Sequence, residues 1–129
     1  MLRSIIVWFT WIWAVVFVPI ETYLSWSSTP ASLSGYAVNV FGVGIAVWGA
    51  VSLHKGRPYA EGMLATGWGW TTATFWRGAN LRYWLASQGE PLSFGRVELW
   101  LAPAFTIMAG AALAGSMILL LNRHRHSDE

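Results

Sequence analysis

Residues 97–121 read VELWLAPAFTIMAGAALAGSMILLL, and Glu98 is the single charged side chain among them. At a rise of 1.5 Å per residue, a helix of about 20 apolar residues crosses the hydrocarbon of a bilayer. Three stretches of similar character precede it, at about residues 4–26, 33–53 and 62–86. The sequence therefore predicts an all-α fold, an integral membrane four-helix antiparallel bundle with short connecting loops. Residues 1–129 would form a single transmembrane domain that ends in a charged tail at 122–129.

The composition favours the same environment. Hydrophobic residues make up 55% of the chain and charged residues 11%, whereas a soluble domain carries roughly one quarter charged residues. The formal charge of +2 is too small and too scattered to indicate a nucleic-acid partner. Cysteine is absent, which excludes disulfides and thiolate sites. We expect the lipid bilayer to be a partner and nucleic acid not to be one.

The joints and the charges predict a topology. Helix-breaking residues separate the stretches at Ser27-Ser28-Thr29-Pro30, Gly56-Arg57-Pro58 and Gly89-Glu90-Pro91. With four spans, both termini and the middle joint lie on one side and carry five Lys and Arg, against three on the other side. The positive-inside rule then predicts a multi-pass protein of the inner or cell membrane with both termini in the cytoplasm. The first stretch is too long for a signal peptide, so we expect it to be retained.

Small residues recur at helical spacing and predict close contacts between helices. In lipid, helices associate through such seams because little hydrophobic force drives them together. The expected packing positions are Gly35, Gly42, Ala46 and Gly49 in the second helix, Gly62, Gly69 and Ala73 in the third, and Gly110 and Ala114 in the fourth.

A polar layer is expected near the outer side of the membrane. Counted at 1.5 Å per residue, Glu21 and Arg77 lie about 25 and 22 Å up their helices. An ionisable residue inside a membrane usually finds a partner, so we expect these two to form an ion pair. It would either fix helix register near the headgroups or line a polar vestibule, an ion path or a ligand headgroup site. The whole expected layer is Glu21, Asn39, Arg77, Asn80 and Glu98.

Ten tryptophans mark the chain. Those near helix ends are expected at the membrane interface, where Trp is enriched: Trp8, Trp11, Trp26, Trp84 and Trp100. The deeper ones would pack on a neighbouring helix, on lipid or on a bound hydrophobic ligand such as a pigment or quinone: Trp13, Trp48, Trp68, Trp70 and Trp76. Packing is the favoured interpretation of the deeper tryptophans, and the sequence assigns no cofactor-binding residue.

The available chemistry argues against an enzyme. His54 is the one histidine near the expected bilayer, which excludes a bis-histidine haem and leaves too few ligands for a buried metal site. No phosphate-binding loop, nucleophile elbow or metalloprotease motif is present. We expect no catalytic residues, no metal and no cofactor.

Two classes of function are open. The favoured interpretation is a non-catalytic accessory or assembly subunit that docks on other membrane protein subunits, or on itself as a homo-oligomer. The alternative is a small oligomeric transporter or channel in which Glu21 and Arg77 act as intramembrane charges. A holin-like pore former is a third interpretation, suggested by the short charged tail.

Overall fold

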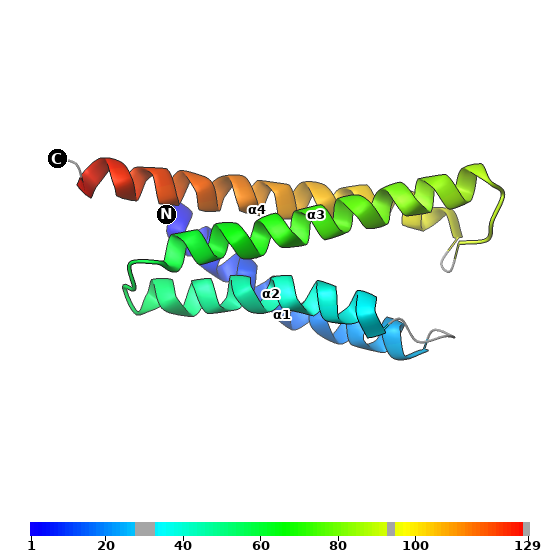
Figure 1. The fold of residues 1–129 in the computed structure, drawn as a ribbon, viewed down its shortest axis with the longest axis horizontal. Coiled ribbons are helices and arrows are strands. Elements are labelled where there is room, and N and C mark those ends of the chain that lie inside the picture. The colour runs from blue at the N-terminus through cyan, green and yellow to red at the C-terminus, as the bar shows by residue number, and fades with distance from the viewer. Residues whose placement is uncertain (28–32, 93–94, 128–129) are drawn as a thin grey trace.

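The computed structural model describes residues 1–27, 33–92 and 95–127, which form four helices, with α1 inclined to the other three (Figure 1). Helix α1 spans Leu2–Ser27, α2 spans Leu33–His54, α3 spans Ala60–Ser87 and α4 spans Glu98–Ser127. A 3-10 turn, η1, precedes α4 at Gly95–Val97. The expected all-α fold with four helices is confirmed. The predicted breakers Ser28, Thr29 and Pro30, the tail residues Asp128 and Glu129 and the side chain of Trp26 lie outside the described residues.

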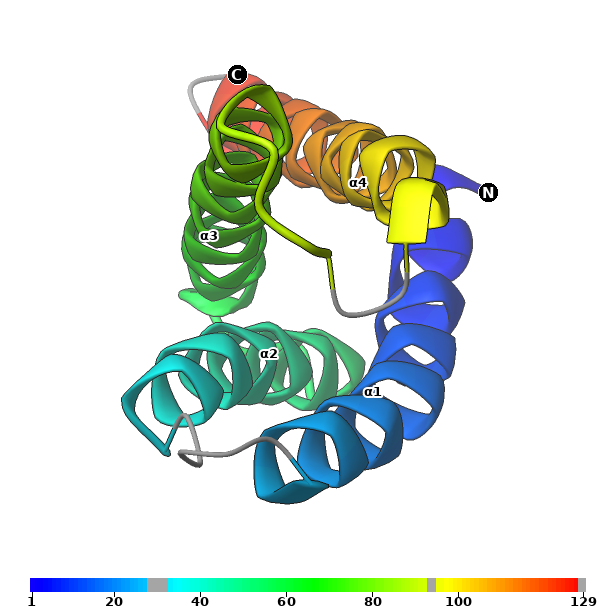
Figure 2. The same ribbon diagram turned by 90° about the vertical axis from the view of Figure 1, so that its right-hand side faces the viewer.

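Successive helices are neighbours in the bundle. Seen end-on, the four helices surround a common centre, and α1 contacts α4 as well as α2 (Figure 2). The most extensive contacts are those of α3 with α2 and with α4, whereas α1 packs less closely on the rest. We call the end that holds both chain termini and the α2–α3 turn the terminal end, and the opposite end the distal end (Figure 1).

Three of the described helices, α1, α2 and α4, are long and apolar enough to cross a membrane. The expected third span, α3, is not in this set. It is 28 residues long, about 42 Å at 1.5 Å per residue, so its length is sufficient. Its lower hydropathy comes from the threonines at 71, 72 and 74 and from Arg77, Asn80 and Arg82.

Helices α2 and α3 end at the predicted glycines. Gly56 has φ 65° and Gly89 has φ 74°, conformations that glycine adopts without steric cost. At the first turn the N–H of Arg57 donates to the carbonyl of Ser52 at 2.9 Å, and the N–H of Gly56 donates to that of Leu53 at 3.1 Å. The same pair of bonds recurs after α3, with Glu90 and Gly89 as donors. Both ends are Schellman motifs, followed within two residues by proline.

The second and third helices touch through small residues. A Cβ atom on Gly49 would lie 2.6 Å from the backbone N of Leu64, and one on Gly67 would lie 2.4 Å from the backbone N of Ala46. Gly42 lies against Trp70 in the same way, at 2.6 Å from Cδ1. Three of the four positions named on α2, Gly42, Ala46 and Gly49, thus lie at this contact. Gly35, the fourth, is half-buried.

The stripe named on α3 is placed differently. Gly67, which was not in it, makes the close approach to α2, while a Cβ on Gly62 would meet nothing within 4 Å and Ala73 is exposed. Gly69 turns toward α4, where a Cβ would lie 3.7 Å from Leu113 Cδ1. The surface of α3 that packs on α2 is therefore rotated from the expected stripe.

Helix α4 differs from its prediction in length and in packing face. It continues through Ser127 instead of ending at about residue 121, so six residues of the expected tail are helical. Gly110 is near Thr72, whereas Ala114 is exposed. The close approach to α1 occurs at Gly115, where a Cβ would lie 2.5 Å from Ile6 Cδ1.

Candidate functional site

At the distal end, polar side chains join α1 to α2. Asn39 Nδ2 donates a hydrogen bond of 2.6 Å to Glu21 Oε1, in a half-buried setting. One helical position further along α1, the Thr22 hydroxyl lies 3.0 Å from the Tyr36 hydroxyl and also donates to the Val18 carbonyl. A carboxylate that accepts a short bond from an amide makes a stronger contact than two neutral groups do. This pair therefore holds the distal ends of α1 and α2 together.

A second distal contact joins α3 to α4. Arg82 Nε lies 3.0 Å from Glu98 Oε2, and its Nη1 donates to the Gly78 carbonyl one turn earlier. The Glu98 side chain is 10% exposed and that of Arg82 is 42% exposed. Tyr83 adds a 2.7 Å hydrogen bond to the Leu99 carbonyl. Because Arg82 is partly exposed, the ion pair contributes little to the free energy of unfolding, and its main effect is to orient α3 relative to α4.

Among the residues of the expected polar layer, one pair is in contact. Glu21 meets Asn39, whereas Glu98 meets Arg82, which is not a member of that layer. Arg77 is exposed, and the ion pairs found among the described residues do not include it, so the expected Glu21–Arg77 pair is absent from them. Asn80 is exposed as well and donates to the Trp76 carbonyl of its own helix.

The interior of the bundle is aromatic at mid-height. Trp13 is 7% exposed, and its ring lies with centroids 5.5–5.8 Å from five others. The five rings come from α1, α3 and α4: Phe9, Phe17, Trp68, Phe75 and Phe105. The buried Trp13 Nε1 has no hydrogen-bond partner within the described residues. We call these six residues the aromatic cluster.

A buried hydrogen bond crosses the bundle beside this cluster. Trp68, which is 1% exposed, donates from Nε1 to Thr10 Oγ1 at 3.1 Å and so links α3 to α1. The Thr10 hydroxyl in turn donates to the Ile6 carbonyl. Three further interior hydroxyls, those of Thr71, Thr106 and Ser116, also donate to a carbonyl four residues earlier in their own helix. These hydroxyls are satisfied locally and do not form a polar path.

The remaining tryptophans that the structure describes point outward. Among the five expected to lie deep, Trp13 and Trp68 are interior, whereas Trp48, Trp70 and Trp76 are exposed. Trp70 Nε1 nevertheless donates to the Val38 carbonyl of α2 at 2.9 Å. The others named at helix ends are also exposed: Trp8, Trp11, Trp84 and Trp100.

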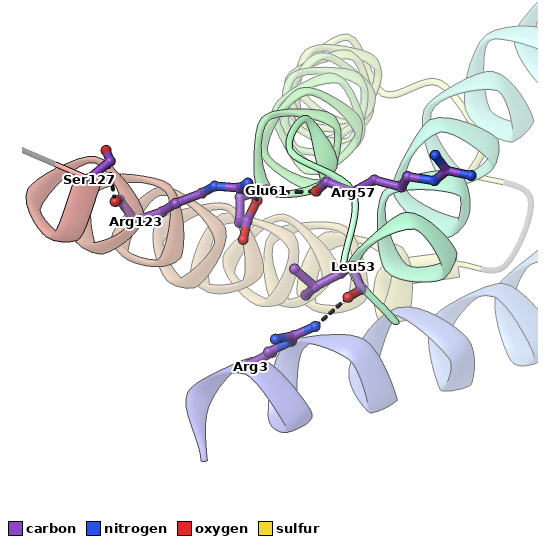
Figure 3. Close-up of polar contacts among 6 residues, drawn as sticks. All are labelled: Arg3, Leu53, Arg57, Glu61, Arg123 and Ser127. Carbon is purple, nitrogen blue, oxygen red and sulfur yellow. Dashed lines mark hydrogen bonds and ion pairs between the residues drawn. The ribbon is translucent and has the colours of Figure 1, made fainter. Parts of the chain in front are cut away.

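Arginine side chains join the helices at the terminal end (Figure 3). Arg123 Nη1 of α4 lies 2.6 Å from Glu61 Oε2 of α3 and 3.2 Å from the carbonyl of Arg57 in the α2–α3 turn. Arg3 of α1 donates from Nη2 to the Leu53 carbonyl of α2 (Figure 3). These cations contribute to the predicted topology, whereas no pattern in the sequence predicts their partners.

Comparisons with known protein families, with characterised proteins and with solved structures give no match. The function therefore has to be inferred from the chemistry of the described side chains. They provide two polar contacts at the distal end, an aromatic interior and a cationic terminal end. No group of three metal-ligating side chains comes together within residues 1–27, 33–92 and 95–127.

Proposed function

We propose that the protein is a non-catalytic, multi-pass membrane protein that serves as an accessory or assembly subunit of a larger membrane complex. The observation that supports this most is the aromatic cluster. It occupies the space between α1, α3 and α4 with six rings, so one copy of the chain offers apolar packing where a transporter needs a polar path. The outer surface and the two ends of the bundle would then be the parts that contact other molecules.

The membrane topology belongs to the same proposal. Helix α3 would cross the bilayer as a fourth span because it packs along both α2 and α4, which are apolar enough to span. Both termini would lie in the cytoplasm of an inner or cell membrane, because five Lys and Arg gather at the terminal end: Arg3, Lys55, Arg57, Arg123 and Arg125.

The outward tryptophans are the surface available for partners. Trp76 is 63% exposed and lies 16 residues into α3, about 24 Å from its start. That is deeper than the interfacial belts where tryptophan usually faces headgroups. A protein neighbour, either another subunit or a second copy, would cover such a ring.

A pull-down tests this proposal directly. A tagged copy, recovered from membranes dissolved in a mild detergent, is expected to bring a different membrane protein at constant stoichiometry. Recovery of the tagged chain with copies of itself alone would contradict the accessory role.

A flux assay separates the rival function. Purified protein in liposomes is expected to carry no ion or substrate flux. If Glu21→Gln abolishes a flux that Glu90→Gln preserves, a transporter or channel would replace the proposal. Glu90→Gln is the matched control because Glu90 is an exposed acid in the α3–α4 joint.

A further inference from the structure

Two grooves open at the terminal end, one on each side of the last turns of α2. The first lies between α1 and α2, has a volume of about 470 Å³ and is lined by Arg3, Trp8, Trp11, Val51, His54 and Lys55, among others. The second, also about 470 Å³, shares Val51 and Lys55 with the first and adds Trp48 and Arg57. Both grooves combine cations with tryptophan.

In the first groove the cations and the aromatic rings lie at different heights. Arg3 is in the first turn of α1, and Lys55 directly follows the last residue of α2. Trp8 and Trp11 lie five and eight residues beyond Arg3, which is about 8 and 12 Å further into the bundle. The groove is thus cationic at its mouth and apolar along its length.

The positive charge at this mouth is not neutralised by the neighbouring acid. Glu61 is 2.6 Å from Arg123 and is held by it. Arg3 uses a single N–H of its guanidinium to reach the Leu53 carbonyl, and a guanidinium has five such donors. Lys55 is exposed, and the ion pairs among the described residues do not include it. The acids Asp128 and Glu129 lie outside the described residues.

We propose that the groove between α1 and α2 binds one anionic phospholipid. Its phosphate would sit at Arg3 and Lys55, because a guanidinium binds phosphate with two parallel hydrogen bonds and a lysine adds a compact charge. One acyl chain would run over Trp8, Trp11 and Val51. A phosphate without an acyl chain would leave these rings uncovered, so the apolar part of the groove selects lipid. The inference rests on the proposed membrane insertion and adds a ligand to it.

Native mass spectrometry of the purified full chain tests the site. The detergent solution contains equal amounts of phosphatidylglycerol and phosphatidylcholine with the same acyl chains. The wild type is expected to retain one phosphatidylglycerol in preference. Arg3→Gln combined with Lys55→Gln is expected to weaken this binding roughly 30-fold, about 2 kcal/mol at about 1 kcal/mol per cation. The control Arg96→Gln, an exposed cation in η1, is expected to bind as the wild type does.

A second measurement begins with the unaltered protein and does not require the Arg3 and Lys55 variant to fold. Phosphatidylglycerol brominated in its acyl chains is expected to quench tryptophan fluorescence more than brominated phosphatidylcholine does. A Trp8→Phe and Trp11→Phe double variant should lose this difference. Three results would overturn the proposal. The two brominated lipids could quench equally, or the Arg3 and Lys55 variant could retain as much phosphatidylglycerol as the wild type does. Millimolar inorganic phosphate could also displace the lipid.

The two proposals fail separately. Preferential lipid binding without a partner subunit would contradict the accessory role and leave the lipid site standing. A stoichiometric partner without lipid preference would contradict the lipid site alone.

Discussion

Gly67 is the position where the smallest change should have the largest effect. A Cβ atom there would lie 2.4 Å from the backbone N and 2.7 Å from the Cα of Ala46, whereas non-bonded heavy atoms rest at about 3.5–4.0 Å. Both neighbours are backbone atoms of α2, so no change of rotamer can relieve the overlap. In Gly67→Ala, α2 and α3 would have to separate by roughly 1 Å.

The matched control is Gly62→Ala in the same helix, where an added Cβ meets nothing within 4 Å. Alanine favours a helix over glycine by about 1 kcal/mol, and this gain is shared by both variants. Overpacking costs about 1–3 kcal/mol and applies to Gly67→Ala alone. The free energy of unfolding should therefore be about 1–3 kcal/mol lower in Gly67→Ala than in Gly62→Ala.

The assay is reversible unfolding in mixed micelles, with increasing dodecyl sulfate and helix content followed by circular dichroism. Gly44→Ala on α2, which also meets nothing within 4 Å, provides a second control. If Gly67→Ala proves as stable as Gly62→Ala, the close contact between α2 and α3 is refuted.

Two further variants test single contacts. Trp68→Phe should lower the free energy of unfolding by about 1–3 kcal/mol in the same assay, because it removes a buried hydrogen bond and part of a buried ring. The control Trp76→Phe, at an exposed ring, should change this free energy little. Equal effects of the two variants would refute the interior position of Trp68. Glu98→Gln removes the ion pair with the half-exposed Arg82, so it should cost at most about 1 kcal/mol and speed amide hydrogen exchange in the last two turns of α3 up to about fivefold. Unchanged exchange relative to Glu90→Gln would contradict that contact.

The joints were predictable because single residues decide them. Gly56 and Gly89 take positive φ angles that other residues rarely adopt, and a proline follows each. The ends of α2 and α3 therefore fall within about one or two residues of the predicted bounds. The far end of α4 has no such residue, and the helix runs through the charged tail to Ser127.

The packing face of α3 was not predictable from spacing alone. Small residues occur along several stripes of this helix, and Gly62 and Gly67 each continue a plausible one. The choice between them depends on Trp68, whose ring has to fit among the side chains of α1. This packing involves residues distant in sequence, so the spacing of small residues in α3 does not predict it.

For the polar side chains too, the sequence predicts the height along the helix but not the direction in which the side chain points. Counting residues gives the height of Glu21 and Arg77 along their helices, but their directions follow from which faces pack inward. Arg77 lies on the outward side of α3, whereas Arg82, five residues later, turns toward α4. A symmetric count about Glu90, in the α3–α4 joint, places Arg82 opposite Glu98, each eight residues away.

The diagonal hydrogen bond between Thr10 and Trp68 has a consequence for the order of assembly during synthesis. These residues are 58 positions apart, which a ribosome covers in about 3–12 s at about 5–20 residues per second. The hairpin of α2 and α3 joins neighbours in sequence and can form while α4 is still being made. The α1 rings of the aromatic cluster therefore remain without their α3 partners, Trp68 and Phe75, until α3 has been synthesised.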